Sequence, residues 1–313
     1  MSVNVRLPEV NHYLDRPSAI PLVPVQLEST GPIIWCKLEF LNPSGSTKDR
    51  IANFILGKAL RSGAVKLGGT VVEASSGSTS IAMALASAQM GLKFVAVMPE
   101  GVSAERRLII ESFGGEVIFS PRSAGVLGAM NGAVETARER GGFLPSQFSN
   151  LDNPAAHRYQ TAREIIAQIP GGCVDAVVSG VGTGGTLVGL CQGFGDFGRE
   201  ALAFAARPVA GLALDGAECC SFSGRIPGVV DGLSTIYSEH KPNSLIELDV
   251  ADEEALEVAR RLIRMGFPVG PSSGLNYQAA LLAARRLPAE SRIVTVFPDR
   301  MERYFSTELF RRN

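Results

Sequence analysis

The nine residues "NPSGSTKDR" (42–50) join two segments of different character. Before them, "IIWCKLEF" (33–40) is rich in apolar, aromatic and β-branched residues, as a strand is, and after them "IANFILGKAL" (51–60) has helical apolar spacing. The pattern predicts a strand, a loop and a helix, with Lys48 in the first helical turn. The positive end of a helix disfavours a cation and lowers the pKa of an amine, so Lys48 is a candidate nucleophile. The alternative is an ordinary surface lysine in a salt bridge.

The same alternation of strand-like and helical segments runs along the whole chain, which predicts a doubly wound α/β fold with mainly parallel sheets. The turn-rich stretch 141–157 is predicted to cross between two lobes. The further strand-like runs are "TVVEAS" (70–75), "KFVAVMP" (93–99), "EVIFSP" (116–121), "DAVVSGV" (175–181), "VAGLALDG" (209–216), "LIELDV" (245–250) and "RIVTVFPD" (292–299).

Composition excludes several classes of function. The 313 residues are 45% hydrophobic and 19% charged with a net charge of −1, which argues against nucleic-acid binding and membrane anchoring. No apolar run reaches the length of a membrane span, and the N-terminus lacks a signal-peptide pattern. Five cysteines without a CxxC pair indicate a reducing cytoplasm, and three histidines without a metal-binding spacing predict no metal site.

A glycine-rich loop, "SGVGTGGTLVG" (179–189), stands between a predicted strand and a helix. Consecutive unobstructed backbone N–H groups, two hydroxyls and a helix N-terminus together form a phosphate cradle. The residues that form it are Gly182, Thr183, Gly184, Gly185 and Thr186. A dinucleotide site and a plain glycine turn are the alternatives. The mid-chain position argues against the first and the hydroxyls against the second, and the loop lacks the GK[ST] ending of a nucleotide P-loop.

Two serine-rich loops also enter helices. In "EASSGSTS" (73–80) the hydroxyls of Ser75, Ser76, Ser78 and Thr79 suit a small anion such as an α-carboxylate, with ordinary helix capping as the alternative. In "GPSSGLN" (270–276) capping by Ser272 or its neighbour is again the alternative. A reactive lysine together with a phosphate cradle suggests that the partner of Lys48 is the aldehyde of pyridoxal 5′-phosphate.

At this point the motifs carry a resemblance. The segment 37–56, "KLEFLNPSGSTKDRIANFIL", resembles the active-site segment of the cysteine synthase and cystathionine β-synthase family of pyridoxal-phosphate enzymes. The loops at 73–80, 180–186 and 270–276 resemble its substrate, phosphate and pyridine-nitrogen loops, and "QFSNLDNPAAH" (147–157) and "FPDRMERYFST" (297–307) resemble further family segments. The motifs follow the family's order over nearly the whole chain.

The resemblance implies roles for individual residues. Lys48 would hold the cofactor and move the α-proton, and the loop from Gly182 to Thr186 would bind its phosphate. Ser272 would contact the pyridine nitrogen, and Ser78 would contact the ring hydroxyl where most relatives have asparagine. The substrate carboxylate would bind at Ser75, Ser76, Gly77, Thr79 and Gln147. Arg225 lies in a segment that faces the active-site mouth in the family, where it would recognise a phosphate ester; a solvent-facing arginine in a loop is the alternative, and it is slightly favoured.

The implied fold resembles that of the tryptophan synthase β subunit, with pyridoxal phosphate in the cleft between two lobes. Residues 1–12 and 36–147 would form the smaller lobe, and residues 13–35 and 148–313 the larger one. The implied reaction is β-replacement on O-acetyl- or O-phospho-L-serine by a small nucleophile, with sulfide giving cysteine. Thiosulfate, an amine or homocysteine as nucleophile and a non-catalytic regulatory homologue are the alternatives. A cytoplasmic homodimer is expected.

Overall fold

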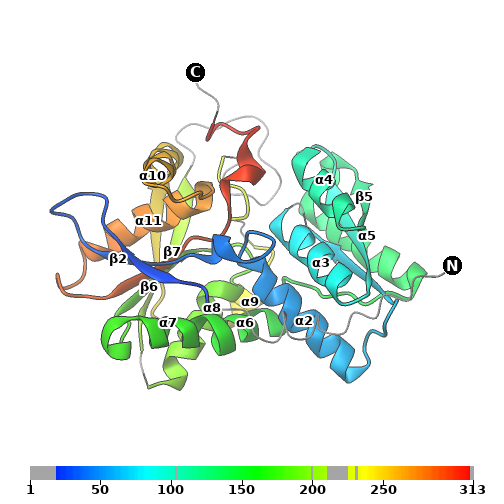
Figure 1. Ribbon diagram of the computed structural model, residues 1–313, viewed down its shortest axis with the longest axis horizontal. Helices are drawn as coiled ribbons and strands as arrows, with labels where there is room; N and C mark the ends of the chain where they lie inside the picture. The colour runs from blue at the N-terminus through cyan, green and yellow to red at the C-terminus, as the bar shows by residue number, and fades with distance from the viewer. Residues whose placement is uncertain are drawn as a thin grey trace.

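The segment around Lys48 folds as its sequence predicts. The computed structural model describes residues 19–75, 77–102, 104–198, 200–209, 225–229 and 232–310 (Figure 1). Strand β2 (Ile34–Lys37) runs into a loop, and helix α2 (Lys48–Ser62) begins at the lysine itself. The helix ends at Gly63 with φ +76°, a left-handed conformation that glycine adopts without strain.

A six-stranded sheet forms the larger of two sheets, in the order β1-β2-β9-β6-β7-β8. Only β1 and β2 pair antiparallel, and the four other neighbouring pairs are parallel. Its strands are β1 (Leu22–Val25), β2, β6 (Ala176–Gly180), β7 (Leu202–Val209), β8 (Ile246–Ala251) and β9 (Ile293–Val296).

The second sheet is parallel throughout, in the order β3-β4-β5. Its strands are β3 (Thr70–Ala74), β4 (Lys93–Pro99) and β5 (Glu116–Ser120). The remaining helices are α3 (Ser78–Gln89), α4 (Ala104–Ser112), α5 (Gly125–Arg140), α6 (Asp152–Ala156), α7 (Ala162–Gln168), α8 (Gly185–Asp196), α9 (Thr235–His240), α10 (Asp252–Arg264) and α11 (Pro271–Ala284). These parallel sheets confirm the predicted α/β class.

Helices cover both faces of the larger sheet, so each face has its own core. Figure 1 shows α10 and α11 on one side of the sheet and α7 and α8 on the other. Tyr277 and Phe297 are fully buried in the first core, and Phe194 is fully buried in the second. Burial on both faces explains why these strands read as continuous apolar runs.

The three-stranded sheet packs with α3, α4 and α5, apart from the larger sheet in Figure 1. Its core contains Ile81, Met83 and Met98, together with side chains of α2. The division into two lobes stays a prediction. The predicted boundary between residues 35 and 36 runs through β2, which belongs entirely to the larger sheet.

Two strands of the larger sheet were not predicted. Strand β7 occupies 202–209, between β6 and β8, whereas the sequence favoured a strand at 209–216. Residues 210–216 lie outside the described residues. The true strand, "LAFAARPV", contains three alanines, which favour helix in isolation, and its place in the sheet overrides that preference. Strand β1 is short and contains a proline, so its strand signal is weak.

Within the described ranges, no helix is both long and apolar enough to cross a membrane. The same part of the chain brings no three histidine, cysteine, aspartate or glutamate side chains together as a candidate metal site.

Candidate functional site

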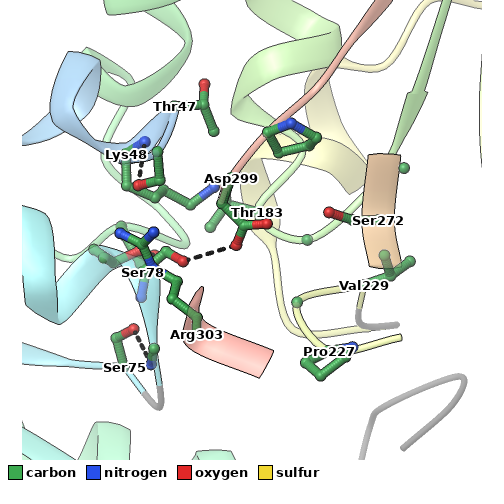
Figure 2. Close-up of a pocket in the computed structure, with 18 of the residues that line it drawn as sticks. Thr47, Lys48, Ser75, Ser78, Thr183, Pro227, Val229, Ser272, Asp299 and Arg303 are labelled. Atoms are coloured by element: carbon green, nitrogen blue, oxygen red, sulfur yellow. Dashed lines mark hydrogen bonds between the residues drawn. The ribbon is translucent and has the colours of Figure 1, made fainter. Parts of the chain in front are cut away.

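A cavity of about 400 Å³ collects the predicted loops. It is lined by the start of α2, the loop between β3 and α3, the loop between β6 and α8, the start of α11 and the segment after β9 (Figure 2). In parallel sheets the carboxyl ends of strands and the N-termini of helices meet at one edge, so segments distant in sequence converge there.

Lys48 enters this cavity from the first turn of α2. Its side chain points toward Asp299 in Figure 2, and its amine makes no hydrogen bond or ion pair with the part of the chain that the structure describes. Burial lowers the pKa of Lys48, and the negative charge of Asp299 partly opposes that shift. The largest cause is therefore loss of solvent rather than the helix end invoked from the sequence. A lowered pKa makes the amine a better nucleophile and base at neutral pH.

Asp299 is a site residue that the sequence analysis did not single out. Its Oδ2 accepts hydrogen bonds from the hydroxyl of Ser78 at 3.1 Å and from that of Tyr304 at 2.6 Å, while its Oδ1 is buried without a partner. Burial raises the pKa of Tyr304, which keeps that hydroxyl protonated as a donor. The signal in the sequence was an acidic residue three positions after the end of the apolar strand β9, at the edge of the sheet where ligands bind.

The loop between β6 and α8 requires glycine for two separate reasons. At Gly182 a Cβ atom would lie 2.3 Å from the carbonyl oxygen of Gly228, so any side chain would displace the facing loop. At Gly184 the backbone has φ +78°, a left-handed conformation. The loop therefore presents bare backbone to the cavity at the N-terminus of α8, as an anion cradle requires.

The two threonines of this loop are held by side chains from the preceding segment. Thr183 Oγ1 accepts from Asn153 Nδ2 at 2.9 Å, and Thr186 Oγ1 lies 3.2 Å from His157 Nε2. Burial, together with the charges of Lys48 and Arg50, holds the pKa of His157 well below its usual range, so the imidazole is neutral. These contacts fix the rotamers of both hydroxyls.

The loop between β3 and α3 lies on the opposite wall. Ser75, Gly77, Ser78 and Thr79 all line the cavity, and Ser76 lies outside the described residues. Thr79 is buried, and its hydroxyl donates to Gln147 Oε1 at 2.6 Å. The predicted substrate-loop residues that are described therefore come together with Gln147 in one place.

Among the described residues, no serine side chain caps the helix that follows either serine-rich loop. The residue before α3 is Gly77, the residue before α11 is Gly270, and neither helix has a side-chain cap. Ser272, the second residue of α11, faces the cavity instead (Figure 2). The capping alternative is therefore wrong for Ser75 and for the loop at 270–276, whereas Ser76 lies outside the described residues and its capping role stays untested.

Two predicted site residues do not line the cavity. Arg225 is held by Glu253 and Glu308, with its Nε 2.7 Å from Glu308 Oε2, so its charge is already matched by two carboxylates. Gly185 begins α8 behind the loop, where a Cβ atom would lie 1.9 Å from Oδ1 of Asn153. The lining of the cavity gives no support to the phosphate-ester role of Arg225 or to the phosphate contact from Gly185, and both stay predictions.

The cavity wall contains arginines that the sequence reading missed. The charged side chains that line it are four cations and one anion, namely Lys48, Arg106, Arg122, Arg303 and Asp299. Arg303 donates to the carbonyl oxygens of Ser44 and Gly45, which anchors the loop before Lys48. No sequence pattern marked these arginines, because they come from an amphipathic helix, a short turn and the C-terminal segment.

The chain is similar in sequence to known proteins. A family model described as pyridoxal-phosphate dependent enzyme matches residues 16–299. A cysteine synthase from Staphylococcus aureus (strain Mu50) is 38% identical over 284 residues, covering 88% of this chain and 89% of the relative. Cysteine synthase B from Campylobacter jejuni is 37% identical over 288 residues, covering 91% and 94%.

Solved structures agree over nearly the full length. An O-acetylserine-dependent cystathionine β-synthase from Helicobacter pylori superposes with a TM-score of 0.83 at 31% identity, covering 95% of this chain and 98% of that chain. An O-ureido-L-serine synthase gives a TM-score of 0.83 at 34% identity, covering 95% and 94%. The chain therefore belongs to the family of pyridoxal-phosphate dependent enzymes.

Proposed function

We propose that this enzyme catalyses β-replacement on O-acetyl-L-serine with sulfide as the nucleophile, which makes it a cysteine synthase. The observation that carries the proposal is the amine of Lys48, whose pKa burial lowers, inside a cavity that also holds an anion cradle and a serine-rich loop. The names of the Staphylococcus aureus and Campylobacter jejuni relatives support the same reaction.

The residues present fit pyridoxal phosphate. Bare backbone at Gly182 and Gly184 with the hydroxyls of Thr183 and Thr186 suits the phosphate, and Lys48 suits the aldehyde. Ser272 would face the pyridine nitrogen with a neutral hydroxyl, and Ser78 would face the ring hydroxyl. When bound, the cofactor supplies the electron sink that acidifies the α-hydrogen of an amino acid.

The chain's own groups would carry the remaining steps. Ser75, Gly77, Thr79 and Gln147 would bind the substrate carboxylate, with Ser76 in the same loop. Lys48 Nζ would take the proton from Cα and later return it to Cα. Overall the Cβ–O bond breaks, acetate leaves with its electron pair, and a Cβ–S bond forms with sulfide. No net oxidation or reduction occurs, so no further reactant is needed.

A substrate panel tests this function. The purified enzyme with pyridoxal phosphate would receive O-acetyl- or O-phospho-L-serine, each with sulfide, thiosulfate, homocysteine or an amino acid. Cysteine from O-acetyl-L-serine and sulfide should form with the highest kcat/KM. A higher value for another pair would replace the proposed substrate or nucleophile, and no product from any pair would favour the regulatory homologue.

A phosphate leaving group is the second candidate, because four cations and one anion line the cavity. The side chain of Arg122 lies against Gly101, where a Cβ atom would be 3.7 Å from its guanidinium carbon. Arg122 makes no hydrogen bond or ion pair among the described residues, so it is available to a dianionic phosphate ester.

We further propose a homodimer in the cytoplasm, as the family resemblance suggests. Light scattering on the eluted protein measures the oligomeric state. A mass of twice the 33.1 kDa chain supports the dimer, and a single chain mass overturns it.

A further inference from the structure

The second-to-last residue of β3, Glu73, is a buried carboxyl group without a cationic partner. Its side chain is 2% exposed and makes no ion pair with the described residues. Elements packed on β3 are β4, α3 and α5, and α3 carries no titratable side chain. The titratable side chains of β4 and α5 are all exposed, and none of them contributes to the pKa shift of Glu73. They are Lys93 on β4 and Glu135, Arg138, Glu139 and Arg140 on α5.

Backbone N–H groups take the place of a cation. Glu73 Oε2 accepts from the N–H of Gln147 at 3.1 Å, and Oε1 accepts from that of Ala74 at 2.9 Å. The N–H of Ser146 also favours the charged form. Ser146 has φ +55° and is the only non-glycine residue in the described ranges with positive φ. Such a conformation persists only where surrounding contacts enforce it, and the carboxylate of Glu73 is such a contact.

The turn that Glu73 holds carries a side chain of the cavity. Gln147 Nε2 donates to the carbonyl oxygen of Ala74 at 2.8 Å, and its Oε1 accepts from Thr79 Oγ1 at 2.6 Å. The amide therefore spans the end of β3 and the first turn of α3. Its position depends on the backbone of residues 146 and 147, and that backbone depends on the carboxylate behind it.

We infer that Glu73 is a positioning residue for the amino-acid substrate, which it controls through the Ser146–Gln147 turn in a manner that depends on its charge state. The inference rests on the proposed function, in which Thr79 and Gln147 bind the substrate carboxylate. Glu73 does not line the cavity itself. It acts from behind the loop, through its hydrogen bonds to the backbone of Gln147 and Ala74.

The charge state matters because three donors point at one carboxyl group. An ionised carboxylate accepts all of them, whereas a protonated carboxyl places its own O–H against an N–H. Burial raises the pKa of Glu73 to about 7, so the change falls near neutral pH. Below that pH the protonated form releases part of the turn, and amino-acid affinity should fall as the pH drops through about 7.

The test compares Glu73→Gln with the wild type and with Glu135→Gln, an exposed glutamate on α5, all loaded with pyridoxal phosphate. Glu73→Gln keeps the shape of the side chain but replaces one acceptor oxygen of the carboxylate by a donor NH2 group. We expect its KM for O-acetyl-L-serine to rise about tenfold, as for one lost hydrogen bond to a charged group, with kcat and cofactor absorbance unchanged. Calorimetric binding of O-methyl-L-serine should weaken more steeply below pH 7 in the wild type and in Glu135→Gln than in Glu73→Gln, where only the titration of the ligand's own amino group remains.

A second variant separates positioning from general destabilisation. Ser146→Gly removes the strain of positive φ, so the turn needs the carboxylate less. The double variant Glu73→Gln/Ser146→Gly should recover part of the lost affinity. No recovery, or a pH profile of Glu73→Gln identical to that of the wild type, overturns the inference.

Failure of the inference about Glu73 can be distinguished from failure of the proposed function. If the wild type makes no product from any serine ester, the proposed function fails, while the O-methyl-L-serine titration still reports on Glu73. If Glu73→Gln does not fold, the pH dependence of O-methyl-L-serine binding to the wild type tests the role of Glu73. Constant affinity between pH 6 and 8 would then contradict the role of Glu73.

Discussion

The hydroxyl of Ser78 donates a hydrogen bond to Oδ2 of Asp299 at 3.1 Å, between residues 221 positions apart in the sequence. The bond joins the first turn of α3, beside the smaller sheet, to the segment that follows β9 of the larger sheet (Figure 2). The same oxygen accepts from Tyr304, so the carboxylate of Asp299 is fixed from two sides. A fixed negative charge near Lys48 tunes the amine that the proposed reaction requires.

Replacing Asp299 by asparagine should lower the pKa of Lys48. Asp299 raises that pKa against the larger effect of burial, so removing the negative charge leaves burial unopposed. The neutral amine condenses with an aldehyde, so it should dominate to lower pH in Asp299→Asn. The rate at which the apoenzyme takes up pyridoxal phosphate, measured from pH 6 to 9, should have its midpoint shifted to lower pH. An unchanged or higher midpoint would show that Asp299 does not act on Lys48.

Lys48→Ala should remove the covalent bond to the cofactor. Reduction with borohydride followed by mass spectrometry should find pyridoxal phosphate attached to the wild type and not to the variant. Lys58→Ala is the matched control, because Lys58 lies on the same helix, 59% exposed, in an ion pair with Asp152. Equal labelling of Lys48→Ala and the wild type would mean that another lysine holds the cofactor.

The sequence predicted the parts of the site that depend on local pattern. The helix start at Lys48 and the loops at 75–79 and 180–186 follow from glycine, serine and apolar spacing. Contacts between segments that are distant in the sequence have no local sequence pattern from which they could be predicted. Asp299, Asn276 and the arginines of the cavity wall act through tertiary contacts, such as Asn276 Oδ1 accepting from the N–H of Gly180 at 2.6 Å.

Arg225 shows the converse limit of sequence reading. The neighbouring residues Pro227 and Gly228 line the cavity, but Arg225 itself pairs with carboxylates that the sequence analysis did not predict. Glu253 is the second residue of α10 and Glu308 lies near the C-terminus, so neither is close to Arg225 in the sequence. Charge pairing across such separations depends on the packed fold rather than on local sequence.

Ser272→Asp should alter the chemistry of the bound cofactor. A carboxylate at the start of α11 would keep a proton on the facing ring nitrogen, which a neutral hydroxyl does not. We expect slower β-replacement and more transamination, read from turnover and from conversion of the bound cofactor to pyridoxamine phosphate. Ser272→Ala is the control, because it removes the hydroxyl without adding charge. Unchanged turnover with no new product in Ser272→Asp would contradict the role given to Ser272.

Arg122→Ala should separate the two leaving groups. If Arg122 meets a phosphate ester, kcat/KM for O-phospho-L-serine should fall about fivefold, as for a partly exposed ion pair, with the value for O-acetyl-L-serine unchanged. Arg138→Ala on α5 is the control, because Arg138 is exposed and pairs with Glu135. Equal changes for both esters would remove the phosphate from this part of the cavity wall.

Thr79→Ala tests the substrate loop directly. The Thr79 hydroxyl is buried and donates to Gln147, and α3 has no side-chain cap that the substitution could remove. Loss of one hydrogen bond to a charged substrate group costs about 1.5–3 kcal/mol, so kcat/KM for O-acetyl-L-serine should fall about tenfold to a hundredfold. Thr79→Ser is the matched control, because it keeps the hydroxyl and removes only a methyl group.

The cofactor spectrum of Thr79→Ala should stay that of the wild type, because the predicted phosphate loop lies at 182–186 on the opposite wall of the cavity. A normal kcat/KM would remove residues 75–79 from the substrate site, and a lost spectrum would show that this loop holds the cofactor. We also expect the part of the chain from residue 73 to residue 139 to close over bound substrate, which adds a further readout. If Thr79 grips the carboxylate, hydrogen exchange in α3 should slow on adding O-methyl-L-serine to the wild type and to Thr79→Ser, and much less in Thr79→Ala.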